Sequence, residues 1–191
     1  METSQLLRKR GKAVGQRGFT IVEMMVSILI LTIGVVGTAA LMSNSVNMGA
    51  HARFVSTAAL LASEKMEDLD RFPDNDPNLA AGGSLGADVA GYSDSVQIST
   101  YNGNINEVTT ANGATTLYTQ NPDGTVVVTP GANLGAASPD MLTYDRRWQI
   151  VANPTVGANV ITGAVQITVL VTLTNQSLNP PVSYQTSLVH P

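Results

Sequence analysis

The order of apolar and polar positions divides this chain into an apolar stretch, an amphipathic stretch and a region of short alternating segments. From Phe19 to Met42 the side chains are mostly apolar, and Glu23 is the single charge. As an α-helix these residues extend roughly 36 Å, enough to cross a hydrocarbon core of about 30 Å. The stretch is longer than the apolar region of a secretory signal. It therefore predicts a retained membrane anchor.

The helix is expected to continue beyond the apolar stretch, because no proline follows Met42 until Pro73. Apolar residues recur there at spacings of three and four, which place them on one helical face. The members of this face are Val55, Ala59, Ala62, Met66 and Leu69. Glu67 and Arg71 have the spacing of a helical ion pair. Since a residue before proline is disfavoured in α conformation, we expect one helix over residues 19–70.

After this helix the composition changes to short β-like runs between turn signals. Residues 73–91 are rich in Gly, Pro, Asp and Asn, which predicts a linker or surface loop. The β-like runs are Ser95–Tyr101, Thr125–Thr129, Arg146–Ala152, Ala164–Thr174 and Val182–Val189. Apolar residues alternate from Val165 to Leu173, as expected for a sheet with one covered face. The segment Asn121–Gly124 (NPDG) predicts a turn.

These patterns predict an α+β fold. One long N-terminal helix, with a transmembrane first half, packs on an antiparallel β-sheet of about four strands. We expect residues 19–42 to form the transmembrane half, residues 43–72 the amphipathic half that covers the sheet, and residues 73–191 a β-rich head.

The distribution of charge predicts the orientation of the chain in the membrane. Residues 1–18 carry five basic residues and one acidic residue, whereas the remaining chain carries five and thirteen. By the positive-inside rule, residues 1–18 lie in the cytoplasm and the head lies on the other side of the inner (cytoplasmic) membrane, which the chain crosses once. The acidic remainder offers no basic face, so no nucleic-acid partner is expected.

Candidate chemistry is sparse. The chain has no cysteine, which excludes disulfides, thiolate metal sites and thiol catalysis. His51 and His190 are too far apart in sequence to indicate a metal site, and no triad or nucleophile-elbow spacing occurs. No catalytic residue, cofactor or metal is expected, and the chain is not expected to be an enzyme. Arg146–Trp148 (RRW) is either a partner-binding patch or part of a strand whose tryptophan lies in the core.

The segment Arg17–Glu23 (RGFTIVE) combines a basic flank, a glycine, a phenylalanine and an apolar run with glutamate at its fifth place. It closely resembles the class III signal of type IV prepilins. This resemblance implies that residues 1–18 are a leader peptide, cleaved between Gly18 and Phe19 by a prepilin peptidase. It also implies methylation of the new Phe19 amine.

Glu23 needs a partner, because a carboxylate inside a membrane helix costs about 2.5–3.5 kcal/mol at the centre of the bilayer. Phe19 lies four residues earlier and is expected on the same helical face. After cleavage, the glutamate of one chain can neutralise the Phe19 amine of the next, and the family is understood to assemble in this way. The alternative is a glutamate that is protonated or reaches the membrane interface. Thr20 fits the pattern as a small polar neighbour that helps orient the amine.

Gly34 and Gly37 lie in the apolar stretch and allow two interpretations. They permit close helix contact between subunits or local melting in a fibre, or they reflect ordinary glycine content of membrane helices. Many major pilins have a helix-bending proline in this region and this chain has none. The place of any bend is therefore left open.

The segments ILTIGVVGTAALM and ALLASEKMEDL are most similar to PilV-type minor pilins. The lack of cysteines also favours a minor subunit, since major pilins commonly end in a disulfide-closed loop. The resemblance implies a structural subunit of a type IV pilus, or fimbrium, that primes or modulates fibre assembly. The alternatives are a pseudopilin of a type II secretion or competence pseudopilus and, less favoured, a membrane-anchored hydrolase or binding domain. The expected partners are other pilin subunits, the prepilin peptidase, the inner-membrane assembly platform and, before assembly, membrane lipid.

Overall fold

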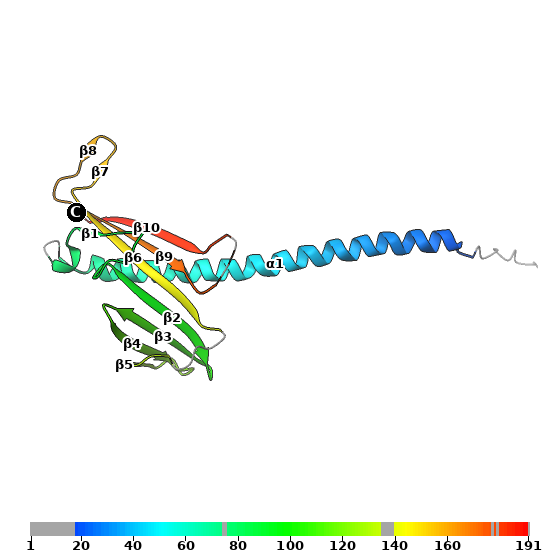
Figure 1. Cartoon of the computed structure of the whole chain (residues 1–191), viewed down its shortest axis with the longest axis horizontal. Coiled ribbons are helices and arrows are strands. Elements are labelled where there is room, and N and C mark those ends of the chain that lie inside the picture. The colour runs from blue at the N-terminus through cyan, green and yellow to red at the C-terminus, as the bar shows by residue number, and fades with distance from the viewer. Residues whose placement is uncertain (1–17, 74–75, 135–139, 177, 179, 191) are drawn as a thin grey trace, which may run out of the picture. The chain divides into compact units, whose positions relative to one another are not determined.

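The computed structural model describes residues 18–73, 76–134, 140–176, 178 and 180–190 (Figure 1). The rest of the expected leader, residues 1–17, and two residues of the expected linker, 74–75, lie outside the described residues. The chain forms two compact units, Met1–Val46 and Asn47–Pro191, and one helix has residues in both.

Helix α1 runs from Ile21 to Asp70. It ends where the sequence predicted, three residues before Pro73. It begins two residues after Phe19, so the expected start was two residues too early. Directly after the helix, Arg71 Nη2 lies 3.1 Å from Glu67 Oε1, which confirms the ion pair predicted from their spacing.

The second unit contains an antiparallel sheet of eight strands in the order β10-β9-β6-β2-β3-β4-β5, with β1 paired to β6. The antiparallel sheet is confirmed, but the expected number of about four strands was too low. A separate pair, β7 and β8, forms a small hairpin, and a short 3-10 helix, η1, follows α1. The bounds are η1 Pro77–Leu79, β1 Gly82–Gly83, β2 Ser93–Tyr101, β3 Asn104–Ala111, β4 Ala114–Gln120, β5 Val126–Pro130, β6 Leu142–Ala152, β7 Thr155–Val156, β8 Asn159–Val160, β9 Val165–Leu173 and β10 Ser183–His190.

Strands β3 and β4 account for most of the underestimate. They are rich in Thr and Asn and bury only one hydrophobic side chain, that of Val108, so they lack a clear apolar alternation. Their hairpins are closed by Asn102–Gly103 and Asn112–Gly113, and all four residues have positive φ, between 51° and 79°. Paired positive φ angles are typical of the two-residue turns that join antiparallel strands. These two Asn-Gly pairs were the sequence signal for the missing strands.

The core of the second unit lies between α1 and the central strands of the sheet. The buried α1 residues are Ala58, Leu61, Ala62 and Leu69, with Phe54, Val55 and Met66 partly buried beside them. They pack on inward residues of β2, β6 and β9, which are Val96, Tyr144, Trp148, Ile150, Ile167, Val169, Val171 and Leu173. The predicted alternation of β9 and its cover by the amphipathic half of α1 are confirmed. The helix face is turned slightly from the expected one, because Ala58 is buried where Ala59 is only half-buried.

A buried ion pair joins the neighbouring strands β2 and β6. Arg146 donates to both carboxylate oxygens of Asp94, from Nε at 2.7 Å and from Nη2 at 3.0 Å. Burial favours the neutral form of Arg146, but the hydrogen bond and charge of Asp94 outweigh it and raise the pKa of the guanidinium. Trp148 is also buried, and Arg147 binds Asp88 at 2.6 Å. The RRW segment is therefore part of a strand with a core tryptophan and not an exposed patch.

We expect Asp94→Ala to lower the free energy of unfolding by about 3–5 kcal/mol, because it leaves Arg146 buried without its carboxylate. Urea unfolding followed by the fluorescence of Trp148, the only tryptophan, measures this. Arg71→Ala, which removes an exposed ion pair, is the matched control and should cost about 1 kcal/mol or less. Similar losses in the two variants would contradict a structural role for the buried pair.

Candidate functional site at the start of α1

The first turn of α1 is organised by Thr20. The backbone N–H of Glu23 donates to Thr20 Oγ1 at 3.2 Å, and the N–H of Met24 donates to the Thr20 carbonyl at 3.1 Å. Thr20 is thus the N-cap of the helix, three residues before a glutamate, which is the spacing of a capping box. This role of Thr20 was not predicted, although the Thr-x-x-Glu pattern is visible in the sequence.

The two residues expected to act together lie in different kinds of backbone. Phe19 precedes the N-cap, whereas Glu23 lies in the first helical turn. They therefore do not share a helical face, which corrects the expectation drawn from their four-residue spacing. Glu23 is favoured at this end of the helix, because the helix dipole stabilises a negative charge there by roughly 0.3–1 kcal/mol.

The bond between Gly18 and Phe19 lies outside the helix. Both residues are exposed and neither is helical. Exposed, non-helical backbone is the kind of segment that proteases cut most readily. The local structure is therefore compatible with cleavage at this bond.

The first unit presents an apolar surface that its own described residues do not cover. Every residue from 18 to 46 is exposed, and the most apolar 18-residue window has a mean hydropathy of 2.3. By length and composition this part of α1 is able to cross a membrane. Its polar side chains are partly satisfied by the helix itself, since Thr32 Oγ1 donates to the Ile28 carbonyl at 2.7 Å and Thr38 Oγ1 to the Val35 carbonyl at 2.9 Å. Such bonds reduce the cost of hydroxyls in lipid.

Gly34 and Gly37 lie within continuous helix. A Cβ atom added at either position would meet no neighbour within 4 Å. The space beside both glycines is therefore open to another molecule, and α1 is not interrupted there.

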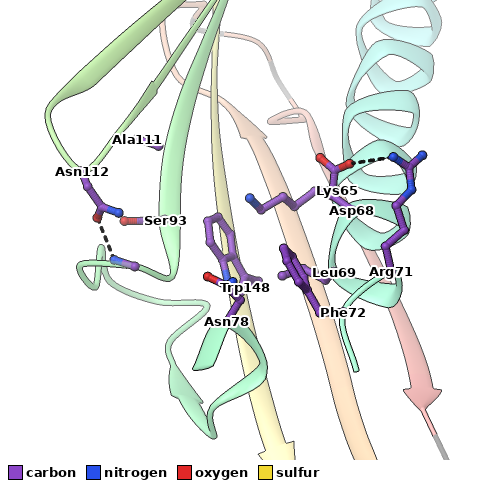
Figure 2. A pocket seen from close by; sticks show the side chains of 11 residues that line it. Lys65, Asp68, Leu69, Arg71, Phe72, Asn78, Ser93, Ala111, Asn112 and Trp148 are labelled. Carbon is purple, nitrogen blue, oxygen red and sulfur yellow. Dashed lines mark hydrogen bonds and ion pairs between the residues drawn. The ribbon is translucent and has the colours of Figure 1, made fainter. Parts of the chain in front are cut away.

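The second unit has a cavity of about 470 Å³ at the C-terminal end of α1 (Figure 2). Lys65 and Arg71 supply its positive charges. Lys65 Nζ lies 3.5 Å from Asp94 Oδ2 and 4.0 Å from the ring centroid of Trp148, while Arg71 pairs with Glu67. These charges are already paired within the chain, which favours a structural role. Among the described residues, no group of three side chains suited to a metal ion occurs.

A second concavity, of about 210 Å³, lies between α1 and the outer strands. We call it the acidic groove; it is lined by Glu64, Ile105, Glu107, Tyr118, Gln120 and Val126. Burial and then the negative charge of Glu64 raise the pKa of the Glu107 carboxyl above its ordinary value. Two carboxylates thus share this groove. None of its residues was predicted as a site, because Glu64 on α1 is distant in sequence from the strands β3 to β5 that supply the others, and β3 and β4 were not predicted.

Comparison with known proteins identifies the N-terminal segment. Residues 14–39 match the family model described as the prokaryotic N-terminal methylation motif. A search of curated proteins gave no match, and neither did a search of solved structures. The chain thus carries the N-terminal methylation motif, or class III signal, that is typical of type IV pilin and pseudopilin precursors. The matched residues include Gly18, Phe19, Thr20 and Glu23.

We expect Thr20→Val to loosen the first turn of α1 by about 0.5–2 kcal/mol, because it removes the capping oxygen and keeps the shape of the side chain. Amide hydrogen exchange at Glu23, measured by NMR in detergent micelles, should become faster. Thr20→Ser keeps the oxygen and should exchange like the wild type. Equal exchange in the two variants would show that the cap is not formed.

We expect Glu107→Gln to stabilise the protein at pH 7 and to lose this advantage below about pH 4.5. The folded carboxyl has a raised pKa, so the folded state binds more protons than the unfolded state between the two pKa values, and stability falls as pH rises through that window. Urea unfolding at pH 4 and pH 7 measures the change. Glu67→Gln, on the exposed side of α1, is the control, and a Glu107→Gln protein less stable than wild type at pH 7 would refute the argument.

Proposed function

We propose that this chain is a PilV-type minor pilin, a structural subunit that primes or modulates assembly of a type IV pilus. Its leader is removed between Gly18 and Phe19, and the new Phe19 amine is methylated. One observation carries this proposal: a methylation motif over residues 14–39 directly leads into an apolar helix that no described part of the chain covers.

The apolar half of α1 explains both stages of such a function. Before assembly, an uncovered helix of this length is stable in the inner membrane. In a fibre the same surface is buried against the helices of other subunits. Gly34 and Gly37, with open space beside them, support close helix contact at that stage. The amphipathic half carries the sheet and keeps it outside the membrane.

Glu23 is proposed to bind the Phe19 amine of a neighbouring subunit. The start of α1 at Ile21 supports an interchain contact, because Phe19 lies beyond the helix and off the helical face of Glu23 in the same chain. An apolar environment strengthens the attraction between the two charges and makes an unpaired glutamate costly. Thr20 supports the arrangement by fixing the first turn, from which Glu23 projects.

A pseudopilin of a type II secretion or competence pseudopilus is the second candidate, because the methylation motif is typical of both assemblies. The lack of cysteines favours a minor subunit but does not separate the two machines. Co-purification from the native membrane separates them, since the partners would be pilus components in one case and secretion or competence components in the other. A membrane-anchored hydrolase or binding domain gains no support from the cavity at the C-terminal end of α1, because Lys65 and Arg71 in that cavity are already paired within the chain.

We expect co-expression with a prepilin peptidase to remove Met1–Gly18 and leave a methylated Phe19, as intact mass and N-terminal sequencing can show. Glu23→Gln should be cut normally but should lose most of its incorporation into fibres, because its neutral amide cannot neutralise the amine. Glu67→Gln is the matched control outside the apolar half. An uncut wild-type chain would contradict the proposed cleavage at Gly18. Normal incorporation of Glu23→Gln would contradict the proposed contact between Glu23 and the Phe19 amine.

A further inference from the structure

The face of the sheet beside α1 has an apolar patch over its outer strands. The patch consists of Ile105, Tyr118, Val126 and Val128, whose exposed fractions are 48%, 39%, 57% and 51%. The strand register places them in adjacent rows, since Tyr118 pairs with Val128 and Gln120, next to Ile105, pairs with Val126. Strand β5 is the edge of the sheet (Figure 1), and all five of its residues are exposed. Clustered exposed apolar side chains at a sheet edge mark a surface for binding another molecule.

The acidic groove shares Ile105, Tyr118 and Val126 with this patch and adds two carboxylates beside them. Glu107 stands in the same row as Tyr118 and Val128, and Glu64 faces it from α1. Arg146 pairs with Glu64 at 4.0 Å and also binds Asp94, which Lys65 contacts at 3.5 Å. With Glu107, three carboxylates stand against these two cations. The groove therefore retains unbalanced negative charge and favours a partner with a basic side chain next to an apolar one.

The outer face of α1 offers such a pair. Arg53 is exposed and, among the described lysines and arginines, is the one without an acidic partner within 4.0 Å. Leu60 is 68% exposed and lies seven residues later, two helical turns along the same face. At 1.5 Å per residue the two positions are about 10 Å apart along the helix axis.

We propose that the acidic groove binds α1 of a second copy of this chain, with Arg53 of that copy against Glu64 and Glu107, and its Leu60 on the apolar patch. The interface is heterologous, because the two copies contribute different surfaces. The inference goes beyond the proposed function, since it requires neither cleavage at Gly18 nor a pilus. Its test uses the unprocessed full-length chain, so that a failure of processing cannot be mistaken for a failure of this contact.

Disulfide trapping tests the contact directly, because the chain has no cysteine of its own. A Leu60→Cys protein is mixed with a Tyr118→Cys protein in detergent micelles and oxidised. The matched control replaces Tyr118→Cys with Val189→Cys, which lies on the opposite edge strand, β10, and is similarly exposed. We expect the mixed disulfide at Tyr118 to exceed the control about fivefold. Equal yields would overturn the proposal and assign the groove to a different partner.

Charge reversal provides the second measurement. Arg53→Glu on the Leu60→Cys protein should lower the trapped yield about fivefold, because an attractive contact becomes repulsive. Glu107→Lys on the Tyr118→Cys protein should then restore it. Arg71→Glu on the Leu60→Cys protein is the control for a general effect of charge on the trapped yield. Tryptophan fluorescence of each variant reports that Trp148 remains buried, and a yield unchanged by either reversal would overturn the role of Arg53.

Discussion

The second unit depends on the contact between the amphipathic half of α1 and the central strands. Ala58 and Ala62 are fully buried at this contact, and their small side chains let the helix approach the sheet closely. The strands supply large aromatic side chains, among them Tyr144 and Trp148. The Tyr144 hydroxyl also donates to the Phe54 carbonyl at 3.4 Å. If each buried aliphatic side chain contributes about 1.5–3 kcal/mol, this one contact is the dominant source of stability.

The same helix meets two different environments without a break in its backbone. Between Met24 and Met42 apolar side chains lie on every side of the helix. From Phe54 onward one face is apolar and the other carries charges such as Glu67 and Arg71. Because backbone hydrogen bonds are satisfied within any helix, the change in side chains alone makes the first part of α1 suited to lipid and the second part suited to packing on a sheet. This continuity connects the N-terminal methylation motif to the folded sheet.

Residue patterns with a short period were readable from the sequence. The spacing of three and four revealed the buried face of α1, Pro73 its end, and the alternation from Val165 to Leu173 the inward face of β9. Thr20 was read only as a polar neighbour, although its hydroxyl accepts the N–H of Glu23 and its spacing fits a capping box. Strands β3 and β4 were missed, because half-exposed strands rich in threonine have no apolar alternation to detect.

Long-range pairings could not be read from a single sequence. Asp94 and Arg146 are 52 residues apart, and nothing in either local pattern indicates that they are partners. The acidic groove has the same origin, because Glu64 and Glu107 come from α1 and β3 and meet only after the sheet has formed. The wide sheet therefore creates sites that depend on the fold as a whole.

The width of the sheet explains why α1 leaves its outer strands, β3 to β5, uncovered. A helix is about 10 Å across with its side chains, and strands are about 4.8 Å apart, so one helix covers roughly two or three strands. The main path of the sheet has the order β10-β9-β6-β2-β3-β4-β5, and α1 lies over its central part. Strands β3 to β5 extend beyond the part of the sheet that α1 covers, and many of their exposed side chains are threonines. Ile105, Tyr118 and Val126 lie on the same side of the sheet as α1, where a second helix would cover them. Exposure of these residues to water is costly, and burial under another helix removes that cost. The geometry of one helix on a wide sheet thus favours association.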